Sequence, residues 1–212
     1  MTSEADTLGD WLDAIAARSP APSGGSTSAV VLACAGGLAE MVARFSTAQL
    51  AEADELAAVA ESLRRRAFGL AAADEAAWSG VLDAARSARA ARAAGATGAT
   101  EVPASGSHAA RAGSAFVIAT EVPLRMVEVA AELFPVLRRL AESGNQRLLG
   151  DALAGQHLCF GAASSAGSLV RLNLAQLPAH DRARIEVQLA SAERLLAEAS
   201  GGRWFAPDEP GN

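Results

Sequence analysis

The sequence predicts an all-α protein, a single-domain bundle of five to seven helices with two central helices built from small residues. Ala contributes 53 of the 212 residues and Leu another 24, and both are strong helix formers. Tyr is absent, so the aromatic residues that favour strands are limited to six Phe and three Trp. Residues 48–94 hold no Pro and only two Gly, which leaves room for a long helix. We expect one helical domain over residues 1–200 and a loose tail at 201–212.

The first two expected helices are separated by a segment that breaks helices. Thr7 followed by Asp10 is a capping-box pattern, which predicts a first helix that ends near Arg18. The segment SPAPSGGS then interrupts the chain, and its last residue, Ser26, is a good N-cap for a second helix over 27–46. Ala and Gly along that helix would let neighbouring helices approach closely, so we expect it to be buried. Its apolar positions follow helical spacing, namely Val30, Cys34, Gly37, Leu38, Met41 and Phe45.

The rest of the chain predicts helices and one flexible loop. Residues 48–94 form one long helix or a kinked pair, with an inward face made of Leu56, Val59, Leu63, Leu70, Ala77 and Leu82. The segment at 95–107 is the clearest loop, and Ser107 can cap a helix over 108–141. Pro123 and Pro135 interrupt that helix, and a kink or a break is expected near 121–123. A buried helix over 146–177 and an amphipathic one over 180–199 complete the bundle.

Composition and charge exclude several functions. The formal net charge is −6, so neither a nucleic-acid partner nor an anionic membrane surface is expected. All 18 basic residues are Arg, and a chain without Lys cannot use Schiff-base chemistry or a P-loop lysine. The uncharged stretches at 19–39 and 152–170 contain Pro, Gly and polar residues, and are more typical of buried helices than of membrane spans. Cys34 and Cys159 lie in apolar stretches as small buried residues, and no signal-peptide pattern is present, which predicts a cytoplasmic protein.

Three local features are candidates for a functional site, and each has a plain structural alternative. The PSGGS turn at 22–26 would leave backbone N–H groups open at a helix N-terminus, where carboxylate or phosphate binds, or it is an ordinary capped turn. Asp74 lies in the apolar stretch GLAAADEAAW, where lost solvation would raise its pKa and suit a general acid, or it shares a solvated face with Glu75. Asp151 precedes a charge-free run and is either a site carboxylate or a charge that stabilises a helix N-terminal turn.

Neither a metal nor a cofactor is expected. The patterns CxxC, HExxH, GxSxG and GxGxxG are absent. His108, His157 and His180 lie on separate predicted segments and have no metal-ligand spacing.

Five segments in register resemble one family. PAPSGGSTSAVVLACAGGLAEMV at 20–42 resembles the signature of the cyclodeaminase domain of formiminotransferase-cyclodeaminase and its stand-alone bacterial relatives, which include methenyltetrahydrofolate cyclohydrolases. Ser23 stands where that signature has a glycine. The later motifs of the family are matched by DEAAW at 74–78, EVPLRMVEVAAELFPVL at 121–137, SGNQRLLGDALAG at 143–155 and RLNLAQL at 171–177.

The resemblance implies an all-helical homodimer with a folate substrate and no metal or redox cofactor. The implied activity is that of a formiminotetrahydrofolate cyclodeaminase, which forms 5,10-methenyltetrahydrofolate and releases ammonia, or of a methenyltetrahydrofolate cyclohydrolase, which uses water. The family's catalytic Asp falls on Asp74, here a general acid/base. The implied site residues are Asp74 and Asp151 for catalysis, and Pro22, Ser23, Gly24, Gly25, Ser26, Asn145 and Asn173 for substrate binding.

Two other functions stay open on the sequence. The first is a diverged member of the family that cyclises, deaminates or hydrolyses a non-folate cyclic amine or imine in specialised metabolism. The second is a helical binding protein without catalysis, against which the presence of Asp74 and Asp151 argues.

Overall fold

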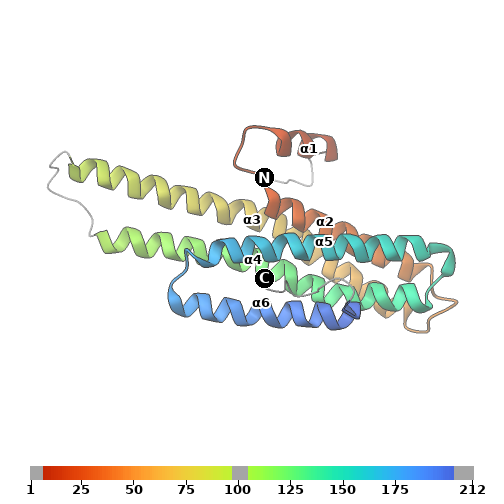
Figure 1. Cartoon of the computed structure of the whole chain (residues 1–212). Helices are drawn as coiled ribbons and strands as arrows, with labels where there is room; N and C mark the ends of the chain where they lie inside the picture. Colours follow the sequence, from red (N-terminus) through yellow and green to blue (C-terminus); the bar gives the residue numbers. More distant parts are fainter. Residues whose placement is uncertain (1–6, 97–104, 203–212) are drawn as a thin grey trace, which may run out of the picture.

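The structure is a computed structural model of the chain, and it describes residues 7–96 and 105–202. Over these ranges the chain forms helices and no strand, which confirms the all-α prediction. Most of the loop expected at 95–107, and most of the expected tail, lie outside the described residues. The elements in chain order are α1 (Leu8–Ala16), α2 (Gly24–Arg44), α3 (Ala53–Ala96), α4 (Ser105–Ser143), the short 3-10 helix η1 (Gln146–Leu148), α5 (Leu149–Leu174) and α6 (Ala179–Ser200) (Figure 1).

The starts of α1 and α2 are both set by reciprocal capping. In α1 the Asp10 N–H donates to Thr7 Oγ1 and the Thr7 N–H donates to Asp10 Oδ2, each at 3.1 Å, which confirms the predicted capping box. The predicted N-cap Ser26 of the second helix is wrong, because α2 begins at Gly24 and its N-cap is Ser23. Ser26 lies inside the first turn, where its Oγ accepts a 2.8 Å hydrogen bond from the Ser23 N–H.

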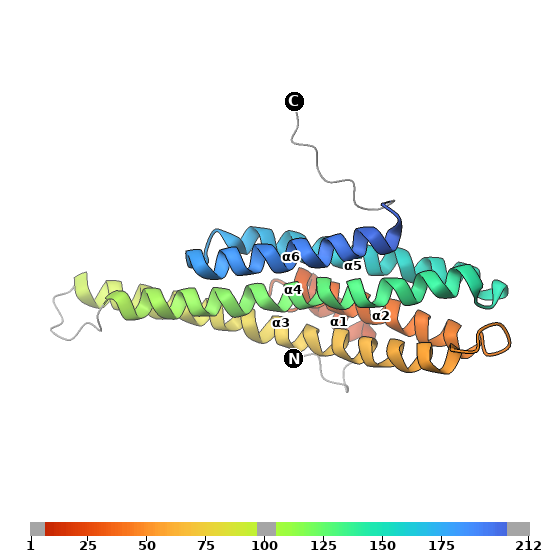
Figure 2. The same cartoon turned by 90° about the horizontal axis from the view of Figure 1, so that it is seen from below.

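The core lies between α2, α3, α4 and α5, and α6 packs against α4 (Figure 2). α2 and α5 bury faces of small residues, and Ser28 on α2 donates a 2.8 Å hydrogen bond to Ser165 on α5. By length and composition α2 is the one described helix that could cross a membrane, and 61% of its apolar window is buried in the bundle. The larger core side chains come mostly from α4, namely Met126, Val127, Val129, Leu133, Phe134, Leu137 and Leu140.

The inward face of α3 consists almost entirely of alanine. Its buried residues recur every three or four positions, at Ala53, Ala57, Ala60, Leu63, Ala67, Ala71, Ala77, Val81 and Ala84. Asp74 takes the place between Ala71 and Ala77 in this series, so it lies on the inward face of the helix. Of the residues expected inward, Leu63 and Ala77 are buried, whereas Val59 is 45% exposed because the smaller alanines take the core positions.

α4 is continuous from Ser105 to Ser143, so of the kink or break predicted near 121–123 the break does not occur. Proline has no N–H, and Pro123 therefore cannot donate the helical hydrogen bond to the carbonyl of Ala119, four residues earlier. The side chain of Asn173 on α5 supplies the missing donor, with Nδ2 at 3.2 Å from the Ala119 oxygen. A residue about 50 positions away in the sequence thus compensates for a helix breaker.

One face of α2 and α5 is exposed and carries no charge over most of its length. Cys34 was expected to be buried and is exposed, and Phe45 at the end of α2 is 63% exposed. The Ala and Gly face of α2 packs inward, and these larger side chains point away from it. On α5 the exposed residues between the first and last turns are Leu153, Ala154, His157, Leu158, Gly161, Ser164, Ser165 and Ser168. α1 stands off the bundle and has no buried residue (Figure 1).

The close approach of α2 to α3 predicts opposite effects for two adjacent glycines. A Cβ on Gly36 would lie 2.9 Å from Arg64 Cβ and 3.0 Å from its Cα, whereas a Cβ on Gly37 would meet only Arg64 Cδ at 3.6 Å. Overpacking costs about 1–3 kcal/mol and alanine gains about 1 kcal/mol over glycine inside a helix. We expect Gly36→Ala to lower the free energy of unfolding and Gly37→Ala to leave it unchanged or raise it, as measured by urea denaturation. Equal stabilities of the two variants would contradict the packing described here.

Candidate active site

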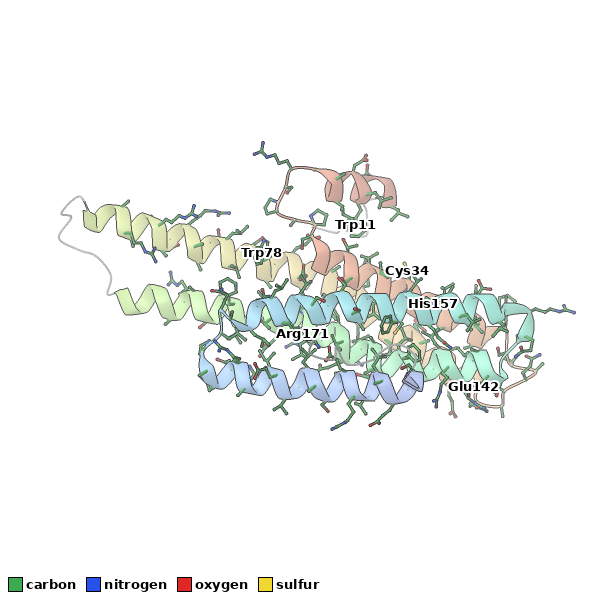
Figure 3. All side chains as sticks on the ribbon, in the orientation of Figure 1. Trp11, Cys34, Trp78, Glu142, His157 and Arg171 are labelled. Carbon is green, nitrogen blue, oxygen red and sulfur yellow. The ribbon has the colours of Figure 1, made fainter. Side chains whose placement is uncertain are left out.

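A cavity of about 330 Å³ opens at the N-terminal end of α2. Its walls are mostly apolar and carry few polar groups, which is the usual character of a small-molecule site. Figure 3 shows Trp78 on the part of α3 beside the start of α2. The lining residues are Ser23, Gly24 and Gly25 at the start of α2, Asp74 and Trp78 on α3, Ala119 and Pro123 on α4, and Leu169, Leu172 and Asn173 on α5.

The carboxyl group of Asp74 lies directly on the first turn of α2. Ser23 Oγ donates a hydrogen bond to Asp74 Oδ2 at 3.2 Å, and the backbone N–H of Ser26 donates to the same carboxyl group. The first N–H groups of a helix have no partners within it and carry partial positive charge, so they attract an anion. The N–H groups of this turn were a candidate site for a ligand carboxylate or phosphate, and in the structure the Asp74 carboxyl group lies on them.

Gly25 is what allows this approach. A Cβ placed on Gly25 would overlap the terminal atoms of the Asp74 carboxyl group. The backbone of Gly25 has an ordinary negative φ, so the glycine is required by the closeness of the two helices and not by its conformation. Gly24 differs, because a Cβ there would point into open space.

Burial raises the pKa of the Asp74 carboxyl group above its ordinary value. The hydrogen bonds from Ser23 and from the Ser26 N–H oppose this rise, and the neighbouring charge of Glu75 adds to it. A carboxyl group with a raised pKa keeps its proton closer to neutral pH than a solvated one, which is the property needed for proton transfer to and from a substrate.

The other residues of the PSGGS turn do not face this cavity. Ser26 is fully buried, and its side chain hydrogen-bonds to the backbone of Ser23, where it closes the turn. Pro22 lines a second cavity, on the side of α2 that faces α1 and α5. Ser23 and Gly24 border both cavities.

Asn145 and Asp151 lie at the other end of the bundle. Asn145 caps η1, where its Oδ1 accepts the Arg147 N–H at 3.1 Å, and its Nδ2 donates to the carbonyl of Phe45 at 3.0 Å. Asp151 lies in the first turn of α5, roughly 33 Å along the helix axis from Asn173. Glu142 marks this end in Figure 3, away from Trp78. The structure therefore does not bring these two residues to Asp74.

Sequence reasoning did not assign Trp78, Pro123 or the two leucines of α5 to the site. Trp78 could have been found, because it follows Asp74 by four residues and so shares its helix face. The leucines have no local signal, since only the packing of α5 beside α3 and α4 brings them to the cavity. Within the described residues, no three His, Cys, Asp or Glu side chains lie close enough to hold a metal ion.

Comparison with known proteins identifies the family to which the chain belongs. The family model for formiminotransferase-cyclodeaminase matches residues 7–193. A methenyltetrahydrofolate cyclohydrolase from Methylorubrum extorquens is 30% identical over 200 residues, which cover 92% of this chain and 90% of that protein. The crystal structure of formiminotetrahydrofolate cyclodeaminase from Thermotoga maritima superposes with a TM-score of 0.78 at 26% identity and covers 94% of each chain. The matched region contains every residue that lines the cavity, and the chain belongs to the formiminotransferase-cyclodeaminase family.

Proposed function

We propose that this protein is a one-carbon folate enzyme, a methenyltetrahydrofolate cyclohydrolase or a formiminotetrahydrofolate cyclodeaminase, in which Asp74 is the general acid/base. The observation that carries the proposal is the half-buried Asp74 carboxyl group, held on the first turn of α2 and bordering an apolar cavity. The family supports a folate one-carbon substrate, and the protein is expected to work in the cytoplasm.

Both activities need proton transfers to or from the oxygen and nitrogen atoms bonded to the same carbon. In the hydrolytic direction, water attacks the methenyl carbon and gives a proton to Asp74, which leaves a hydroxyl group on a tetrahedral carbon. The bond from that carbon to one nitrogen then breaks, the nitrogen takes up the proton from Asp74, and the hydroxyl group releases its own proton to solvent as the formyl C=O forms. In the deaminating direction, a substrate N–H nitrogen attacks the formimino carbon and loses its proton to solvent, Asp74 protonates the departing amine, and the C–N bond to that amine breaks as ammonia leaves. Each path passes through a tetrahedral carbon, and no oxidation or reduction occurs.

The cavity walls suit a flat heterocycle. Trp78 offers an aromatic face, on which a pterin ring can stack. Gly24, Gly25 and Ala119 present backbone and small side chains, so a ring can approach the helices closely. We keep Asp74, Ser23, Gly24, Gly25 and Asn173 in the proposed site; Asp151, Asn145, Pro22 and Ser26 lie outside the cavity and are not assigned contacts with the substrate.

A homodimer is part of the proposal. The exposed face of α2 and α5 is uncharged over most of its length and includes Leu153 and Leu158, and such a face is expected to be covered in the working assembly. α1 supports the same conclusion, because its apolar residues Leu8 and Leu12 are exposed and none of its residues is buried. A second copy of the chain would cover both.

The role of Asp74 predicts a large and specific loss on substitution. Asp74→Asn keeps the shape of the side chain but cannot transfer a proton, so kcat should fall about 10²- to 10⁴-fold on the active folate. Glu75→Gln is the matched control, since residue 75 is rotated about 100° around the helix, and it should keep near-normal kcat.

The same substitution should not destabilise the fold. Because the folded protein raises the pKa of Asp74, ionisation of this group lowers stability at neutral pH, and Asp74→Asn should melt no lower than the wild type at pH 7. Near-normal kcat for Asp74→Asn would refute the assignment.

The pH dependence separates the two directions. Deamination uses the protonated form of Asp74, so kcat should fall as the pH rises through the raised pKa of this group. Hydrolysis uses the carboxylate form, so kcat should rise through the same pKa. Steady-state assays on formimino- and methenyltetrahydrofolate, with the uncatalysed reaction subtracted at each pH, test this. If the wild type turns over neither folate, the non-folate alternative replaces the proposal.

Two neighbouring glycines predict different outcomes for the site. Gly25→Ala should expel the Asp74 carboxyl group and lower kcat/KM by about 10²-fold or more, the scale of losing an acid/base group. Gly24→Ala adds a methyl group that meets no protein atom but borders the cavity, so it should leave Asp74 in place with kcat close to the wild-type value, and any loss should appear in KM. The double variant Gly25→Ala with Asp74→Asn should be no worse than Asp74→Asn alone. Additive losses would show that Gly25 acts independently of Asp74.

The dimer is tested by mass. Multi-angle light scattering at micromolar concentration should give twice the 21.5 kDa chain mass. Leu158→Glu, on the α2 and α5 face, should shift the protein to monomer, whereas Val187→Glu, on an exposed position of α6, should not. A monomeric wild type would contradict the proposal.

A further inference from the structure

The hydrogen bond from Asn173 to the Ala119 carbonyl, which Pro123 leaves without a helical donor, has no role in catalysis by Asp74. Pro123 leaves the Ala119 carbonyl without its helical donor, and Asn173 Nδ2 replaces that donor at 3.2 Å. All three residues line the same cavity as Asp74. The compensation for the proline is therefore made inside the proposed site, where it also orders a polar side chain.

This contact fixes the orientation of the Asn173 amide. An amide has one donor end and one acceptor end, and the two point in divergent directions. The donor end of Asn173 carries two N–H groups, and one of them donates to the Ala119 carbonyl, which fixes the plane of the amide. The fixed plane also fixes the direction of Oδ1, so Asn173 offers a molecule in the cavity a hydrogen-bond acceptor in one set position.

We propose that Pro123 is a positioning residue that locks Asn173 as a fixed hydrogen-bond acceptor, and that this acceptor selects an N–H group of the ligand. Only the identity of the ligand rests on the proposed function; for a folate the partner would be an N–H or amino group of its heterocycle. A freely rotating Asn would accept either a donor or an acceptor at this place. A locked amide keeps Oδ1 in place, so a ligand that presents a carbonyl to Oδ1 is disfavoured, because two acceptors would then face each other in an apolar cavity.

A second proline of α4, Pro135, provides a control for the substitution of Pro123. Pro135 is the second proline of α4 and likewise lacks an N–H, but it lines a different cavity, between α4 and α6. Pro123→Ala restores an N–H that can bond to Ala119 and so releases Asn173. Pro135→Ala makes the same chemical change in the same helix without touching the site.

The test combines a direct view of the amide with kinetics. In the full-length protein without ligand, the side-chain NH₂ signals of Asn173 in a proton–nitrogen NMR spectrum should show slowed exchange with water. That protection should be lost in Pro123→Ala and kept in Pro135→Ala. With the active folate, Pro123→Ala should raise KM roughly 3- to 10-fold, the range expected for one neutral hydrogen bond, with kcat near normal. Asn173→Ala should raise KM at least as much.

The double variant decides whether Pro123 acts through Asn173. If it does, Pro123→Ala adds no further rise in KM in the Asn173→Ala background. Additive effects, or Asn173 amide signals that are the same in the wild type and in Pro123→Ala, would overturn the proposal. Thermal melting of each variant separates a loss of fold from a change in the site. If the wild type turns over neither folate, the proposed function fails, and the NMR comparison still decides whether Pro123 locks Asn173.

Discussion

The contact between the Asp74 carboxyl group and the first turn of α2 is the constraint on which the other features of the site depend. It requires a glycine at position 25, because any side chain there would occupy the space of the carboxyl group. It also requires an α3 face of alanines, which lets the helix approach α2 along its length. The same contact sets the electrostatics of Asp74, since burial raises its pKa while the helix N–H groups and Ser23 limit the rise.

The cavity exists because several helices end or lose regularity near one place. α2 begins there, α5 ends there, and Pro123 interrupts the hydrogen bonding of α4 there, while α3 and α4 continue past it (Figure 2). Each of these features leaves backbone groups without helical partners. Side chains take up some of them, as Asp74 does for α2 and Asn173 does for Ala119. The polar side chains of this site are therefore held where helix ends and the proline leave backbone groups to be paired, and the rest of the cavity wall is apolar.

The sequence predicted the helices well and the site in part. Spacing, caps and breakers are local signals, so the class, the order of the helices and the capping box of Thr7 could be predicted from them. The continuity of α4 could not, because its donor at Asn173 is distant in the chain. For the site, the motifs included Asp74, Gly25 and Asn173, which the fold brings together. Asn145 and Asp151 belong to an equally recognisable motif, but their place at the far end of α5 depends on how the helices are arranged and leaves no local pattern.

The alanine face of α3 determines which substitutions this bundle can accept. An alanine has only one methyl group to lose, so no single truncation along that face can open a large cavity in the core. Enlargement is different, because the neighbouring backbones are already close and have little room to move apart. The chain should therefore accumulate change on its outer faces and at the few large residues of the cavity wall, such as Trp78 and Leu172. Substrate preference can then drift during evolution while the spacing of the helices stays the same.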